Sequence, residues 1–128
     1  MAERSLEELL LETEQRILNN DFYKKYIVTY EDEEYGFYVK PISQNSFMKL
    51  LNKHGNNIAK INEELIFKCL VDEDGKPYKK ELVEILLDEM PAGFSTDITK
   101  CIYEVSGIET DKESQEMLER FLEGTSQL

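Results

Sequence analysis

The spacing of apolar residues over 58–108 constrains the fold of this chain more than any other feature. Apolar side chains recur there every three or four positions, and the pattern is broken only at 72–77 and at 90–94. A period of this length places apolar side chains on one face of a helix. The sequence therefore predicts three packed helices, at about 58–71, 80–89 and 96–106.

Individual residues set the boundaries of these helices. Pro91 cannot continue a helix, so the second helix is expected to end before it. Ser95 or Thr96 is expected to cap the third helix, and Gly107 stands where a left-handed C-terminal residue is common. Over 65–71 a strand is the competing interpretation, because a short apolar run fits either structure.

The inward faces of the three helices predict the core. In the first helix, the apolar positions that fit one face are Ile58, Ile61, Leu65, Ile66, Cys69 and Leu70. In the second they are Leu82, Ile85, Leu86 and Met90, and in the third Ile98, Cys101, Ile102 and Val105. Because core residues of packed helices lie on these faces, we expect burial at Leu65, Cys69, Leu86, Ile98 and Ile102.

In the N-terminal part of the chain, the spacing of apolar residues changes once, from a helical period to the alternation of a strand. Ser5 with Glu8 three residues later is a capping box, which predicts a helix at about 6–18. Its apolar face is formed by Leu6, Leu9, Leu10, Thr13 and Ile17. Alternating aromatic and β-branched residues then predict a β-hairpin at about 25–40. Its acidic break at 31–34 has no Asn-Gly or Asp-Gly pair, so we expect a loop longer than two residues.

Two further helices complete the expected architecture. One, at about 44–53, begins after Ser43 and ends at Gly55. The other, at about 111–122, has an apolar face formed by Met117, Leu118, Phe121 and Leu122. The whole chain, 1–128, is therefore predicted to be a single compact domain of the α+β class, mainly α with a small antiparallel β-hairpin.

The charge of the chain limits its partners. The 128 residues carry a formal net charge of −12, with a pI of about 4.5. Such a surface repels phosphate backbones and anionic lipid headgroups, which argues against nucleic-acid and membrane binding. It favours basic protein partners.

The two cysteines are predicted to be structural. Cys69 and Cys101 both fall on apolar helical positions, and no CxxC or metal-ligand spacing is present. We therefore expect buried structural thiols without a disulfide framework. Because the N-terminus has no signal-peptide core, the expected location is the cytoplasm.

The loop at 72–81 is the best candidate for a metal site. Aligned on Gly75, Asp72 and Asp74 take the third and fifth positions of a calcium-binding EF-hand loop, and Glu81 takes the twelfth. The first position, however, is Leu70, whose side chain has no oxygen. We therefore interpret the loop as an acidic turn between two helices and predict no metal.

No catalytic or cofactor motif is present in the sequence. His54 is the single histidine, and it follows Lys53 in the last turn of a helix, where a cation complements the helix dipole. The glycines are dispersed and none forms a phosphate-binding loop. The sequence therefore predicts a protein that is not an enzyme and binds no cofactor.

The acidic residues gather at the two terminal helices. The first sixteen residues carry five acids against two arginines, and 104–123 carry seven acids against two bases. An amphipathic terminal helix usually closes its own core, but it can also present an apolar surface with an acidic rim to a basic helix. The candidate partner-binding residues are Phe94, in the corner after Pro91, and Met117 and Phe121, on the last helix.

Five segments of the chain resemble one protein family. They are YGFYVKPIS at 35–43, NEELIFKCLVD at 62–72, LVEILL at 82–87, MPAGF at 90–94 and IYEVSGI at 102–108. In their order and punctuation they resemble the tail assembly chaperones of bacteriophages and prophages, particularly those of contractile-tailed phages of Gram-positive bacteria. The resemblance covers residues 35–108.

The resemblance implies a function and partners. A tail assembly chaperone binds the tape measure protein, a long, helical, hydrophobic chain that sets tail length, and keeps it soluble until tail-tube subunits polymerise around it. The tail-tube protein is a second possible partner, and the family has no catalytic residues or cofactors. A rival interpretation from another class is an acidic regulatory or inhibitor protein that binds a basic partner. Self-association is left open by either interpretation.

Overall fold

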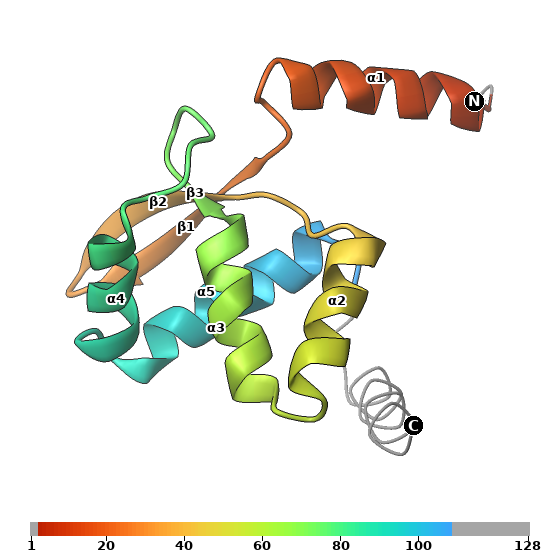
Figure 1. The fold of residues 1–128 in the computed structure, drawn as a ribbon. Helices are drawn as coiled ribbons and strands as arrows, with labels where there is room; N and C mark the ends of the chain where they lie inside the picture. The colour runs from red at the N-terminus through yellow and green to blue at the C-terminus, as the bar shows by residue number, and fades with distance from the viewer. Residues whose placement is uncertain (1–2, 109–128) are drawn as a thin grey trace.

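The computed structural model describes residues 3–108, which form five helices and a three-stranded antiparallel sheet (Figure 1). The predicted α+β class, mainly α with an antiparallel hairpin, is therefore confirmed. The elements in chain order are α1 (Leu6–Leu18), β1 (Lys24–Tyr30), β2 (Glu33–Val39), α2 (Gln44–His54), α3 (Ile58–Cys69), β3 (Leu70–Val71), α4 (Lys80–Asp88) and α5 (Ala92–Val105). The helix expected at about 111–122 lies outside the described residues.

The hairpin β1–β2 is confirmed, but its loop is shorter than expected. Tyr30 pairs with Glu33, so only Glu31 and Asp32 lie between the strands. Both have positive φ, 50° and 65°, as a tight turn that follows the right-handed twist of the strands requires. The expectation of a longer loop is wrong because it assumed that such a turn needs Asn-Gly or Asp-Gly.

The helix expected at 58–71 ends two residues early. Leu70 and Val71 leave α3 in extended conformation and pair with Val39 and Tyr38 of β2, forming β3. The backbone N–H of Lys40 also donates to the carbonyl of Cys69. Both apolar side chains are buried in this short strand, so the apolar pattern alone could not distinguish it from a last helical turn.

Helix α5 begins four residues earlier than predicted, at Ala92 in place of residue 96. Pro91 is its N-cap, with a φ of −55° and a ψ of 142°, a non-helical conformation that proline readily adopts. Ser95 and Thr96 were expected as caps, but their hydroxyls donate to the carbonyl of Ala92 inside the first turns. The C-terminal end agrees with the prediction, since Gly107 has a φ of 75°.

Helix α4 presents a different face from the predicted one. Val83 is buried and Leu86 and Leu87 are partly buried, whereas Leu82 and Ile85 are about half exposed, at 53% and 50%. Both sets have helical spacing, because apolar residues are nearly continuous over 82–87. The expectation of burial at Leu82 and Ile85 is therefore wrong, and Leu86 is only partly buried.

The core lies where α5 meets the sheet and α3. Helix α5 contacts β1, β2, α3 and α4 and crosses behind α3 in Figure 1. The predicted burial of Leu65, Cys69, Ile98 and Ile102 is confirmed. The same cluster includes Phe37, Val39, Leu50, Leu51, Ile61, Ile66, Leu70, Val83 and Tyr103.

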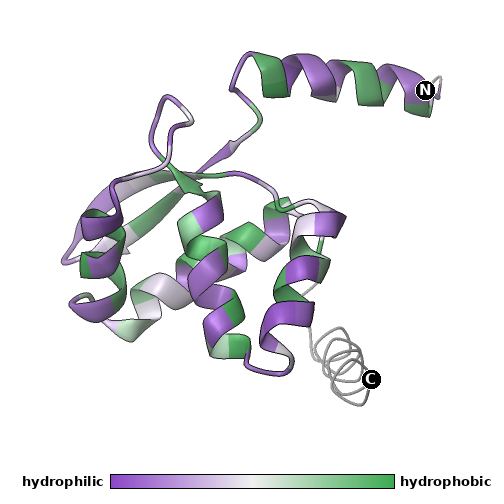
Figure 2. Cartoon of the chain, viewed as in Figure 1, coloured by the Kyte–Doolittle hydropathy of each residue, from purple (hydrophilic) through white to green (hydrophobic). Residues whose placement is uncertain are grey.

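Helix α1 stands apart from this core. It begins at the Ser5 cap, whose hydroxyl oxygen accepts from the Glu8 N–H as the capping box predicts. None of its residues is buried. In Figure 1 it extends away from the other helices, and Figure 2 shows hydrophobic and hydrophilic residues interleaved along it.

Candidate functional site

Of the three binding residues predicted from the sequence, the structure describes one. Phe94 lies in the first turn of α5 and is partly buried, with its ring 5.9 Å from that of Tyr30 in an edge-on contact. It therefore packs against the hairpin. Met117 and Phe121 lie outside the described residues.

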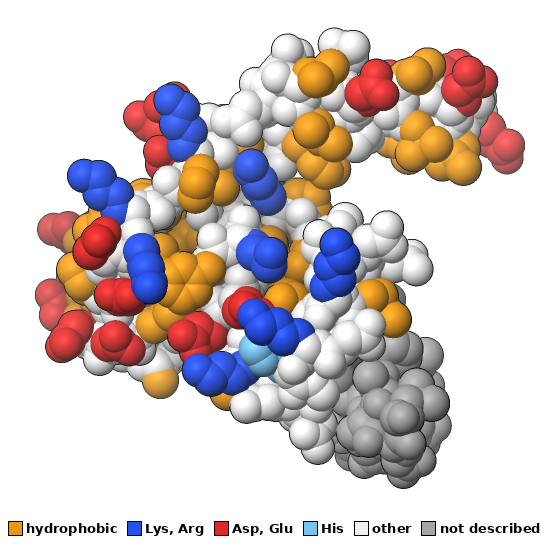
Figure 3. Space-filling view, viewed as in Figure 1, with side chains coloured by type: hydrophobic (Ala, Val, Ile, Leu, Met, Phe, Trp, Pro, Cys, Tyr) orange, Lys and Arg blue, Asp and Glu red, His pale blue; other side chains and the backbone are white. Residues whose placement is uncertain are grey.

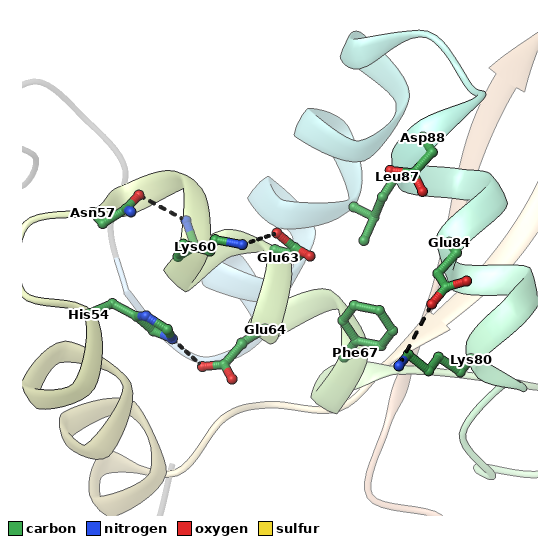
Figure 4. Close-up of a pocket in the computed structure, with 10 residues that line it drawn as sticks. All are labelled: His54, Asn57, Lys60, Glu63, Glu64, Phe67, Lys80, Glu84, Leu87 and Asp88. Carbon is green, nitrogen blue, oxygen red and sulfur yellow. Dashed lines mark hydrogen bonds and ion pairs between the residues drawn. The ribbon is translucent and has the colours of Figure 1, made fainter.

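A groove runs between α3 and α4 (Figure 4). It has a volume of about 720 Å³. Phe67 and Leu87 supply its apolar lining, and Figure 4 shows both between the two helices. Its polar lining is His54, Asn57, Lys60, Glu63, Glu64, Lys80, Glu84 and Asp88.

The charges of this groove are largely paired within the chain. Glu64 accepts from Lys53 Nζ at 3.0 Å and lies 2.6 Å from His54 Nε2. Lys60 pairs with Glu63, and Lys80 pairs with Glu84. The hydrogen bonds from Lys53 and His54 lower the pKa of Glu64 below its ordinary value of 4.5. We therefore interpret these groups as connections within and between helices.

Acidification should expose the contribution of Glu64 to stability. Because the folded-state pKa of this carboxyl is lowered, its contribution is complete above the ordinary pKa of 4.5 and is lost as pH falls through the folded pKa. Urea unfolding between about pH 5.5 and pH 3 should show a larger loss of stability for the parent than for Glu64→Gln. Glu63→Gln is the control and should follow the parent, because its side chain is 43% exposed. Equal losses for the parent and Glu64→Gln would contradict the prediction.

The acidic loop after β3 uses its first carboxylate internally. Asp72 Oδ1 accepts from the backbone N–H groups of Asp74 and Lys76, at 2.9 and 3.0 Å, which closes the turn around Gly75. Within residues 3–108, no group of three His, Cys, Asp or Glu side chains is placed to hold a metal ion. Across the same residues, no helix has both the length and the apolar character needed to cross a membrane.

The two thiols differ in exposure. Cys69 is buried, and burial raises the pKa of its thiol to about 11. Cys101 is only partly buried, so the expectation of burial is wrong for this residue, although desolvation also raises its pKa. Because the thiolate is the reactive form, neither environment favours a nucleophilic cysteine.

The most prominent exposed apolar surface of the described chain is the apolar side of α1. Its six Leu and Ile side chains are between 55% and 71% exposed, namely those of Leu6, Leu9, Leu10, Leu11, Ile17 and Leu18. Four of them, Leu6, Leu9, Leu10 and Ile17, lie along one face, which we call the α1 stripe. Figure 3 shows hydrophobic side chains along this helix and an open notch between it and the rest of the molecule.

Both arginines of the α1 segment are engaged within the segment. Arg4 pairs with Glu8 and Glu12, and the guanidinium of Arg16 lies 3.6 Å from the carboxylate of Asp21. Arg16 also stacks on the ring of Phe22, 5.0 Å from its centroid. The remaining carboxylates leave this segment with an acidic surface beside an apolar one.

A specific contact fixes the base of α1. Asn20 follows the C-cap residue Asn19 and has a φ of 54°, and its Nδ2 donates to the carbonyl of Asp74 at 2.8 Å. The hydroxyl of Tyr23 donates to the carbonyl of Glu73, also at 2.8 Å. Gly75 permits this approach, because a Cβ there would lie only 2.7 Å from the backbone oxygen of Asn20. We call these contacts the α1 anchor.

Sequence reasoning found the α1 stripe but misjudged its surroundings. An amphipathic terminal helix was expected to close its own core, and for α1 this expectation is wrong. The same amphipathic pattern occurs in a helix that covers its own core and in a helix that binds a partner. The anchor, which joins residues fifty or more positions apart, leaves no signal in the sequence.

Comparison of the chain with protein-family models, with curated proteins and with solved structures gives no match.

Proposed function

We propose that this chain is a bacteriophage tail assembly chaperone, which binds the tape measure protein and keeps it soluble during tail assembly. The observation that carries the proposal is the exposed α1 stripe on a helix held away from the core. A chaperone of a helical, hydrophobic client needs an apolar surface that its own fold leaves open.

The size of the stripe is sufficient for such a role. Burying one aliphatic side chain is worth about 1.5–3 kcal/mol. Because the four stripe side chains are between 55% and 69% exposed, together they offer roughly 4–7 kcal/mol, before the cost of association is subtracted. That is comparable with the total stability of a typical domain, so leaving the stripe exposed is a substantial departure from an ordinary monomer.

The net charge of −12 supports the same role. A complex of an apolar client with several acidic chaperones is kept dispersed by mutual repulsion, which opposes aggregation of the client. The five segments within 35–108 that resemble tail chaperones give the proposal its particular client.

Co-expression with the tape measure protein that the proposal expects in the neighbouring gene tests the proposal. We expect the soluble fraction of the tape measure protein to rise and purification of either protein to recover both. A tape measure protein that is equally soluble alone, with no complex eluting, would refute the chaperone assignment. Retention of a basic protein other than the tape measure protein would then favour the acidic regulator.

A further inference from the structure

The α1 stripe has a charged edge whose chemistry selects its partner. Glu7 and Glu14 are seven residues apart within α1, which places them along one side of the stripe, next to Leu10 and Ile17. Among the described residues, neither of these two carboxylates has an ion-pair partner. The edge is therefore a row of free negative charge beside an apolar surface.

The opposite edge of the stripe is different. It carries Arg16 and Glu12, and both are already paired, with Asp21 and Arg4 respectively. A partner helix therefore meets one edge that is neutralised within the chain and one that is not. This asymmetry fixes which side of the partner must carry positive charge.

A second copy of the chain fits this surface poorly. When two such helices pair antiparallel, the same edge of each helix meets, so Glu7 of one copy would lie beside Glu14 of the other. Like charges placed in this way oppose association. The net charge of −12 on each chain adds to the repulsion.

We propose that the α1 stripe binds a basic amphipathic helix, whose apolar face covers Leu6, Leu9, Leu10 and Ile17 and whose lysines or arginines lie against Glu7 and Glu14. The α1 anchor holds the stripe in the open before binding, so less orientational freedom is lost when the partner arrives. The inference rests on the proposed function for the identity of the partner, a segment of the tape measure protein, but not for its chemistry.

Two peptide probes test the chemistry independently of the client. The first is a synthetic helix about two heptads long, with leucine on one face and lysine along its edges, and the second has glutamate in place of lysine. Binding is measured by titration calorimetry to the parent, to Leu10→Gln/Ile17→Gln, and to Glu7→Gln/Glu14→Gln. The matched control is Leu82→Gln/Ile85→Gln, which removes two apolar side chains of similar exposure from α4.

The lysine peptide is expected to bind the parent and the α4 control alike and to bind each α1 variant about tenfold or more weakly. Its affinity should fall when salt rises from about 50 to about 300 mM, and the glutamate peptide should not bind. Equal binding of the lysine peptide to the parent and both α1 variants, equal binding of the two peptides, or no binding at all would each overturn the proposal.

The same variants, co-expressed with the tape measure protein, separate the inference from the proposed function. Loss of co-purification for the α1 variants alone supports both. Co-purification with every variant would retain the chaperone assignment and overturn the α1 site. If the lysine peptide binds through α1 while the tape measure protein does not co-purify with the parent, the surface assignment stands and the chaperone assignment fails.

Discussion

Replacing Ile102 with alanine should lower the free energy of unfolding by about 2–5 kcal/mol. Ile102 lies near the C-terminal end of α5 and has no exposed surface. Helix α5 contacts both long strands, α3 and α4, so a cavity at this position cannot be closed by moving one neighbour. Urea unfolding followed by circular dichroism measures the loss.

Ile17→Ala is the matched control for this experiment. It is the same substitution in another helix, but at a side chain that is 58% exposed on α1. Alanine has the higher helix propensity, so the free energy of unfolding should change by less than about 0.5 kcal/mol. Equal losses for the two variants would mean that α5 is not the centre of the core.

Replacing Gly75 with alanine should destabilise the protein by about 1–3 kcal/mol. Gly75 has a φ of 79°, where an L-residue is strained. A Cβ would also lie 2.7 Å from the Asn20 oxygen and 2.8 Å from the Tyr23 ring, so the α1 anchor must shift. Thermal and urea unfolding measure the combined effect.

Gly107→Ala separates the two causes. Gly107 has a similar φ of 75°, but no atom of the described residues beyond its chain neighbours lies within 4 Å of a Cβ built there. Gly107→Ala should therefore lower the free energy of unfolding only by the cost of the strained backbone, about 1 kcal/mol. If Gly75→Ala costs no more than Gly107→Ala, the close approach of the anchor contributes nothing to stability.

Sequence reasoning succeeded where a local pattern has one structural meaning. Ser5 and Ser43 begin their helices as expected, each accepting a backbone N–H three residues on. Gly55 and Gly107 both adopt positive φ at helix ends. Such signals depend on backbone chemistry within a few residues, so they can be interpreted without knowledge of the tertiary fold.

Sequence reasoning failed where two structures satisfy the same pattern. The apolar run over 82–87 fits more than one face of α4, and only packing against α3 and α5 selects Val83. Leu70 and Val71 are buried either as a helical turn or as a strand, and the free edge of β2 selects the strand. In each case the deciding partner is distant in the sequence.

The candidate site was predictable in composition but not in position. The acidic, amphipathic character of α1 is evident from its residues, whereas its separation from the core depends on the anchor to the loop around Gly75. Conversely, Phe94 was a candidate for contact with a partner, and the structure packs it against Tyr30.

The exposed position of α1 also has an evolutionary consequence. Selection for folding acts on buried residues such as Leu65 and Ile102, because their replacement lowers stability. The stripe residues are not buried within the described chain, so folding places no such constraint on Leu10 or Ile17. Among descendants of this chain, the stripe would drift toward polar residues once its partner was lost, while the core stayed apolar. Persistence of the stripe would therefore reflect the partner, independently of the fold.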